Sequence, residues 1–212
     1  MIDLKPGPWH KIPALAYGVK VIMRRLDAEL ARKGIHLLIA LVPLLSALNR
    51  SNTALLLMAG ILFYTLAESF RFLGFSLPFI SSITKAVLRR REQGRFALAP
   101  VTLGLGALLA LLIFPAPVAS AAIYALAFGD SAGSLIGKFL GRLRPAFLAG
   151  KSIEGSFACL AVSAAAAFLV FRDWRPAIAT GLASLVVDIL PLNDYDNIVM
   201  PLAAGLAALV FL

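Results

Sequence analysis

Apolar residues along this chain gather in long runs that short polar segments separate. The runs have the length of helices, and they lack the short alternating pattern of a membrane barrel. Several hold only about 15 apolar residues, whereas about 20 are usual for a span, so their ends are approximate. The pattern predicts seven membrane-spanning helices, at residues 34–48, 53–73, 97–114, 118–140, 155–171, 177–190 and 198–212.

The start of the chain has a different pattern. From Ile12 to Leu26, apolar residues recur on one face of a helix, and basic residues fall mostly elsewhere. This predicts a basic amphipathic helix lying on the membrane surface, with a solvated N-terminal helix as the alternative. We expect a single integral membrane domain, in which residues 1–30 are interfacial and residues 31–212 form the transmembrane bundle.

Composition supports the membrane class. Hydrophobic residues make up 60% of the chain and charged residues 15%, whereas a soluble domain carries about 25% charged residues. The single cysteine, Cys159, lies in an apolar run and is most simply a small packing residue. The expected fold is therefore all-α, a polytopic membrane helix bundle.

Basic residues are unevenly divided between the polar segments. If the N-terminus is cytoplasmic, every lysine and arginine except Arg50, Arg172 and Arg175 lies on the inner side. The bias predicts an N-in, C-out topology in the cell (inner) membrane. It also explains the net charge of +9 without a nucleic-acid partner.

The same topology puts most ionisable residues of the spans at the cytoplasmic level. An acid inside the bilayer is costly and is a candidate for a functional site. Glu68 and Arg71 are either a structural ion pair or part of that site. The other acids of this layer come from three segments and are Asp130, Asp188, Asp194 and Asp196.

The fourth predicted span also carries glycines at every fourth position, from Gly129 to Gly141. Such a face lets another backbone or a ligand approach closely. The basic residues Lys138, Arg142 and Lys151 are interleaved with the acids. Carboxylates with phosphates hold Mg²⁺, and lysines beside open backbone grip phosphates. These residues predict a Mg²⁺-dependent reaction between a nucleotide and a lipid at the cytoplasmic leaflet.

Three motifs in chain order carry a family resemblance. They are Gly129-Asp-Ser-Ala132 with Gly137 and Gly141, Lys151-Ser-Ile-Glu-Gly-Ser156, and Asp196-Asn-x-x-x-Pro-Leu202. With them the chain resembles the dolichol kinase and phytol kinase family, which includes CTP-dependent diacylglycerol kinases. The resemblance implies a lipid-alcohol kinase that transfers the γ-phosphoryl group of CTP, or another nucleotide, to a polyprenol, a phytol-like alcohol or diacylglycerol. Asp188 stands where the family usually has glutamate, which leaves its role open.

Two other functions stay open at this point. The run Lys151–Gly155 is also similar to a motif of phosphatidate cytidylyltransferases, which release pyrophosphate from CTP, but their closing Asp-Arg-x-Asp-Ser run is missing. The run Asp194–Asn197 favours the kinase. A transporter would need polar residues through both halves of the bundle, and the outer half is apolar.

On the kinase hypothesis, the polar layer positions the reactants and neutralises charge. We expect Asp130 and Asp196 to bind Mg²⁺, with Asn197 as a neutral ligand. Lys151 and Lys138 would neutralise the transferring phosphates.

The lipid hydroxyl needs a base, and the sequence does not choose among Asp194, Glu154 and Glu68. His36, a lone histidine at a helix end, is more simply structural.

The remaining predictions concern close approach and packing. We expect phosphates near Gly129 and Gly133, and helix packing at Gly137 and Gly141. Ser152 either donates to a phosphate or caps the fifth helix. Small-residue faces elsewhere permit a homodimer. The predicted nucleotide-binding residues are Gly129, Ser131, Gly133, Gly137, Lys138, Ser152, Gly155, Ser156, Glu68 and Arg71.

Overall fold

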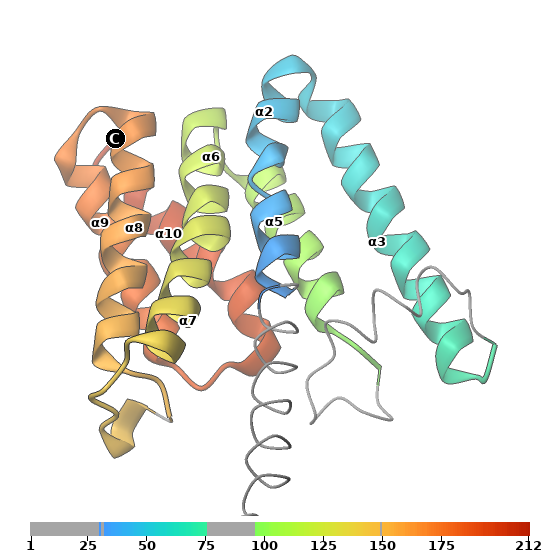
Figure 1. Cartoon of the computed structure of the whole chain (residues 1–212). Coiled ribbons are helices and arrows are strands. Elements are labelled where there is room, and N and C mark those ends of the chain that lie inside the picture. Colours follow the sequence, from blue (N-terminus) through green and yellow to red (C-terminus); the bar gives the residue numbers. More distant parts are fainter. Residues whose placement is uncertain (1–29, 31, 76–95, 149) are drawn as a thin grey trace, which may run out of the picture.

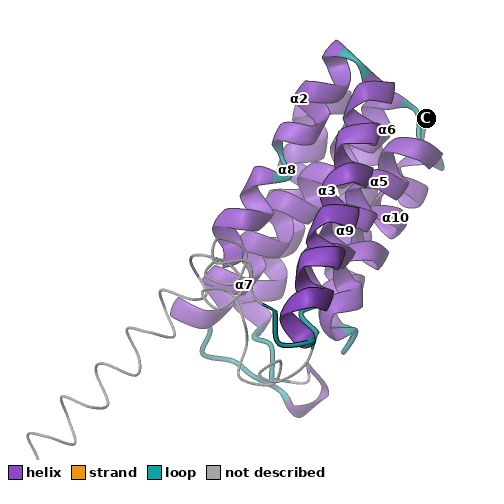
Figure 2. Cartoon of the chain, turned by 90° about the vertical axis from the view of Figure 1, so that its right-hand side faces the viewer, coloured by secondary structure: helices purple, strands orange, loops and turns teal. Residues whose placement is uncertain are grey.

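The computed structural model describes residues 30, 32–75, 96–148 and 150–212. Within these ranges the protein is built from helices and loops, without a strand (Figure 2). The predicted all-α fold is therefore confirmed for this part of the chain. The interfacial helix expected within residues 1–30 lies outside the described residues, apart from Leu30.

Each predicted span coincides with helical structure. Residues 32–38 are helical and continue through a turn into the first labelled helix. The α-helices are α2 (Leu41–Leu48), α3 (Arg50–Phe72), α5 (Ala99–Ile113), α6 (Ala116–Tyr124), α7 (Asp130–Phe139), α8 (Ile153–Phe171), α9 (Trp174–Ile189) and α10 (Asp196–Leu209). Three short elements join them, a π-helical turn η3 (Ala125–Gly129) and the 3-10 turns η4 (Ala146–Leu148) and η5 (Asn193–Tyr195).

Within the described ranges, three helices are long and apolar enough to cross a membrane. They are α3, the continuous rod Ala116–Phe139 that α6, η3 and α7 form, and α8. The 14 residues of α10 extend only about 21 Å at 1.5 Å per residue, less than the hydrocarbon thickness of about 30 Å. The count of seven spans therefore stays a prediction.

The helices run back and forth between two ends of the bundle (Figure 1). The turns after α2, α5 and α8 lie at one end, near the C-terminus. The opposite end, called the polar end below, holds the loop 140–152 and the connection between α9 and α10. Because successive helices run in opposite directions, polar segments that are far apart in sequence lie together at the polar end.

The rod Ala116–Phe139 lies at the centre of the bundle and α3 lies at its edge. In the most apolar 18-residue stretch of that rod, 61% is buried inside the protein. The corresponding share for α3 is 22%. Val118 and Ile123 of α6 pack with Leu111 of α5 and with Phe114, which follows α5, in one core cluster. Leucine and phenylalanine side chains of α3, including Leu62, remain exposed, as expected for a helix that faces lipid.

Helix ends are fixed by local polar contacts. Asn49, Ser152 and Asp173 each accept a hydrogen bond from a main-chain N–H in the first turn of α3, α8 and α9. Such caps satisfy N–H groups that have no partner inside the helix. The sequence alternative that Ser152 caps the fifth predicted helix is confirmed by its 3.1 Å bond from Gly155 N.

Candidate functional site

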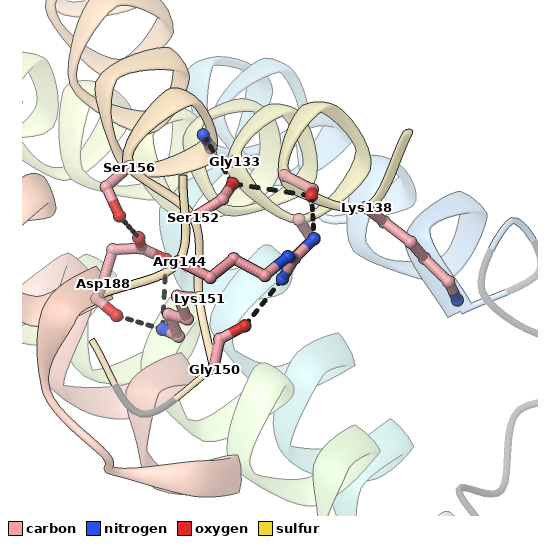
Figure 3. A pocket seen from close by; sticks show the side chains of 11 residues that line it. Gly133, Lys138, Arg144, Gly150, Lys151, Ser152, Ser156 and Asp188 are labelled. Atoms are coloured by element: carbon pink, nitrogen blue, oxygen red, sulfur yellow. Dashed lines mark hydrogen bonds and ion pairs between the residues drawn. The ribbon is translucent and has the colours of Figure 1, made fainter. Parts of the chain in front are cut away.

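A pocket of about 230 Å³ opens at the polar end, where α7, α8 and α9 meet the loop 140–152 (Figure 3). Sites for drug-sized ligands usually enclose about 300–1,000 Å³. The pocket therefore suits a compact polar group, such as part of a phosphate chain, better than a whole nucleotide. Its lining residues are Gly133, Ser134, Gly137, Lys138, Arg144, Gly150, Lys151, Ser152, Gly155, Ser156 and Asp188.

Asp188, Lys151 and Ser156 form a bonded group in the pocket wall. Ser156 Oγ donates to Asp188 Oδ2 at 2.7 Å. Lys151 Nζ donates to Asp188 Oδ1 at 3.1 Å and also to the main-chain oxygen of Asp188. The Asp188 side chain is 7% exposed, whereas that of Lys151 is 36% exposed. The flexible stem of Lys151 thus allows its ammonium to meet an incoming anion while staying near Asp188.

Arg144 and Glu154 shape the loop that closes one side of the pocket. Arg144 Nη1 donates to the oxygen of Gly150 at 2.7 Å, and Nη2 donates to the oxygen of Gly137. Glu154 Oε1 accepts from the N–H groups of Arg142 at 2.9 Å and Leu143 at 3.1 Å. Glu154, one of the predicted bases, is therefore bonded to the backbone of this loop.

Sequence reasoning missed Arg144. In the sequence, Arg144 is only one basic residue in the loop between two glycine-rich helices. The sequence does not show which main-chain carbonyls its guanidinium reaches. In Figure 3 its side chain crosses the pocket between Gly150 and the α7 backbone. Lys138 lines the same pocket, but its side chain extends away from Asp188 and Lys151.

The glycine face of the central rod packs along α8. A Cβ on Gly133 would lie 3.0 Å from Cys159 Cβ and 3.2 Å from Gly155 O. A Cβ on Gly155 would lie 2.8 Å from the Cα of Gly137. Glycines here let the two backbones approach closely. Gly133 and Gly137 also line the pocket, so close helix packing and the pocket share these positions.

Gly129, where a phosphate was predicted, packs against α8 and does not line the pocket. A Cβ added to Gly129 would collide with Ser163, and its other neighbours include Cys159. Gly129 is buried and is absent from the pocket lining. Cys159 is itself fully buried, as expected for a small packing residue. The space on the Cβ side of Gly129 is filled by α8.

Asp130 lies in a second polar cluster, separate from the pocket lining. It forms an ion pair with Lys33, whose Nζ also lies 3.2 Å from the Asp130 main-chain oxygen. His36 Nδ1 lies 3.0 Å from Asp130 Oδ2. Lys33, His36 and Asp130 are 1%, 2% and 7% exposed. Ser134 Oγ, on the pocket side, donates to Asp130 Oδ1 at a long 3.4 Å.

The π-helical turn η3 immediately precedes Asp130. A π turn inserts an extra residue into the helix and is frequent at functional sites. No sequence pattern indicated this turn. The sequence analysis treated His36 as structural, and the meeting of Lys33 with a residue 97 positions away was not predictable from the sequence.

Glu68 and Arg71 form an ion pair away from the pocket lining. Arg71 Nε and Nη2 donate to the two carboxylate oxygens of Glu68 at 2.7 and 2.6 Å. Ala97 N donates to Glu68 Oε1 at 2.8 Å, although Glu68 is fully buried. The observed contacts match the structural alternative for this pair, in which Glu68 ties α3 to the start of the segment before α5.

Asn197 binds α5. Its Nδ2 donates to Thr102 Oγ1 at 3.1 Å and lies 3.4 Å from Ala99 O. Asp194 lies in η5 and Asp196 begins α10, and both are half-buried. Neither acid belongs to the pocket lining.

Two of the three residues predicted to hold Mg²⁺ have protein partners in the described structure. Asp130 already meets Lys33, His36 and Ser134, and the amide of Asn197 is directed to α5. Across the described ranges, no group of three or more histidine, cysteine, aspartate or glutamate side chains gathers as metal ligands would. The prediction of Mg²⁺ at these residues stays a prediction.

The predicted serines have different positions. Ser152 and Ser156 line the pocket. Ser131 is buried outside it, and its hydroxyl finds no hydrogen-bond partner among the described residues. Ser156 donates its single O–H to Asp188, so Ser152 is the one of these three serines whose hydroxyl can donate to a group in the pocket.

The pocket is suited to an anion. Lys138, Arg144 and Lys151 supply three positive charges, and Asp188 supplies one negative charge among the lining residues. The pocket also lies at the N-terminus of α8, where the helix dipole favours negative groups. Serine hydroxyls and glycine backbone complete a set of donors typical of phosphate sites.

Comparisons with known proteins identify no relative. No protein-family model, curated protein or solved structure matches this chain. The resemblance to lipid-alcohol kinases therefore stays a prediction, and function has to be inferred from the pocket and its surroundings.

Proposed function

We propose that this protein is a membrane-embedded phosphotransferase that passes the γ-phosphoryl group of CTP, or another nucleoside triphosphate, to a lipid alcohol. One observation carries the proposal. A pocket with three basic residues and one carboxylate opens at the polar end of a bundle that has helices apolar enough to cross a membrane. Phosphoryl transfer depends mainly on positioning and on neutralising charge, and such a pocket supplies both.

The phosphates would enter between Arg144 and Lys151. Both cations lie in the described pocket, held by main-chain carbonyls and by Asp188. An anion would give them a stronger, charge-assisted partner than a neutral carbonyl. The hydroxyl of Ser152 would donate to a phosphate oxygen, while the Ser156 hydroxyl keeps its hydrogen bond to Asp188. Mg²⁺ would arrive as part of the substrate, bound to the nucleotide's own phosphates.

Exposed apolar side chains beside the pocket suit a lipid acceptor. Phe139 and Leu140 end α7 directly after Lys138, and Leu143 lies in the pocket-closing loop. At the far wall, Leu190 follows the helix that carries Asp188. A lipid whose tail contacts these residues would present its hydroxyl at the level of the phosphates.

Isotope position distinguishes this proposal from its nearest alternative. The purified protein is mixed with Mg²⁺ and CTP labelled on the γ-phosphate, in micelles containing phytol, a polyprenol, undecaprenol or diacylglycerol. Label on the extracted lipid alcohol is expected. Pyrophosphate release that depends on phosphatidate, with no labelled alcohol, would overturn the proposal in favour of a cytidylyltransferase.

A further inference from the structure

Asp188 differs in position from the other acidic residues whose contacts are described above. Its carboxylate lies in the wall of the phosphate pocket, and it is the only carboxylate among the lining residues of the described chain. Glu154 is bonded to loop N–H groups, and Glu68 to Arg71 and Ala97. Both were predicted as bases, and both have their oxygens committed outside the pocket.

The contacts of Asp188 leave it able to take a proton. Each carboxylate oxygen accepts one side-chain hydrogen bond, Oδ1 from Lys151 and Oδ2 from Ser156. A carboxylate has about four acceptor positions, so free lone pairs remain. The two donors also fix its direction, since both come from the first residues around the N-terminus of α8.

Lys151 places the carboxylate next to the reacting phosphate. Lys151 bonds Asp188 and also lines the pocket (Figure 3). A phosphate bound to its ammonium would therefore lie close to the carboxylate. The attacking hydroxyl must lie beside the same phosphorus. A base at hydrogen-bond distance from that hydroxyl meets the first geometric requirement of general base catalysis.

We propose that Asp188 is the catalytic base that accepts the proton of the acceptor alcohol, an inference that rests on the proposed function. The hydroxyl oxygen bonds to the γ-phosphorus while its O–H bond breaks and the proton passes to a carboxylate oxygen of Asp188. The bond from the γ-phosphorus to the β–γ bridging oxygen breaks with its electron pair, and the nucleoside diphosphate leaves. Asp188 then releases the proton to water.

The test compares Asp188→Asn with Asp173→Asn, which changes the other end of α9. Asp173 is exposed and caps that helix, and asparagine caps equally well. Turnover of Asp188→Asn should fall at least a hundredfold, the usual range for losing a general base. Its affinity for CTP, measured separately by calorimetry, should change less than about fivefold. Asp173→Asn should match the wild type.

A second readout separates a base from a positioning group. Fluorine next to the hydroxyl makes an alcohol more acidic and reduces its need for a base. The loss in Asp188→Asn should therefore shrink at least tenfold with a difluorinated acceptor. An equal loss with both acceptors, or a parallel loss of CTP affinity, would overturn the assignment.

Asp188→Glu serves as the control for misfolding, because it keeps a carboxylate beside Lys151. This variant should turn over at least tenfold faster than Asp188→Asn, and equal rates would contradict a base at this position. A wild-type protein that binds CTP but labels no alcohol would overturn the proposed function itself. The two failures are thus distinguishable.

Discussion

Asp130 and Asp188 are both buried carboxylates paired with lysine near the polar end, yet their surroundings differ. Asp130 faces Lys33, which is 1% exposed, and His36, which is 2% exposed. Asp188 faces Lys151, whose side chain is 36% exposed and lines a pocket. The first lysine is enclosed by protein, whereas the second can change partners.

The difference shows how a buried acid in a membrane bundle should be interpreted. Burial alone made Asp130 a candidate for a functional site, because an acid in hydrocarbon is costly. The structure compensates that cost at Asp130 with an enclosed cation. Pairing with a cation that an anion can reach is the feature that indicates binding, and Asp188 with Lys151 has it.

Replacing Lys33 should give the largest change in stability. Lys33→Met would leave the buried charge of Asp130 without its ion-pair partner, which typically costs about 3–5 kcal/mol. Thermal melting in detergent should show a clear drop in the midpoint. The double variant Lys33→Met with Asp130→Asn should regain most of it, and a single variant that melts like the wild type would contradict an enclosed ion pair.

Replacing Lys151 should mainly affect chemistry. Lys151→Ala removes a cation aimed at the transferring phosphates, a loss usually worth about 10²–10³ in turnover. Label transfer from γ-labelled CTP measures it. Arg175→Gln removes an exposed charge from the first turn of α9, at the opposite end of the bundle, and should leave the rate unchanged. Equal effects of the two variants would show that the pocket has no special role.

Gly155→Ala should disturb the packing that separates the two regions. Its Cβ would lie 2.6 Å from Gly133 O and 2.8 Å from Gly137 Cα, so α7 and α8 would have to move apart. Overpacking of this kind costs about 1–3 kcal/mol, visible as a lower melting temperature. Gly60→Ala on α3, where no atom lies within 4 Å of the new Cβ, should be neutral or slightly stabilising.

Ser134→Ala should have the smallest effect. Ser134 is the hydrogen-bonded link between the pocket lining and Asp130, and its bond is long at 3.4 Å. Hydrogen bonds contribute about 0.5–1.5 kcal/mol net, and a long one should lie at the low end. Turnover should change less than about threefold. A loss as large as that of Lys151→Ala would mean that Asp130 is coupled directly to the reaction.

Much of the helical layout was predictable from the sequence. Apolar runs gave the helix positions, and Ser152 before a helix gave its cap. Lys151, Ser156 and Gly133 were also found, because charges and glycines in apolar runs are rare enough to notice.

The rest depends on contacts that no local pattern contains. Arg144 binds main-chain carbonyls, and Lys33 meets Asp130 across 97 positions of sequence. Gly129 and Gly133 look alike in sequence, but only Gly133 lines the pocket, because α8 covers Gly129 near Ser163. Spacing predicts which residues share a helix face, and the neighbouring helix decides what that face meets.

Lysine reactivity tests the central claim most directly. The folded protein is treated briefly with an amine-acylating reagent, with and without saturating CTP and Mg²⁺, and each lysine is quantified by mass spectrometry. Lys151 should react and be protected at least tenfold by CTP, while Lys33 stays unmodified in both samples. Equal labelling of Lys151 with and without CTP would contradict a phosphate pocket at this end of α8.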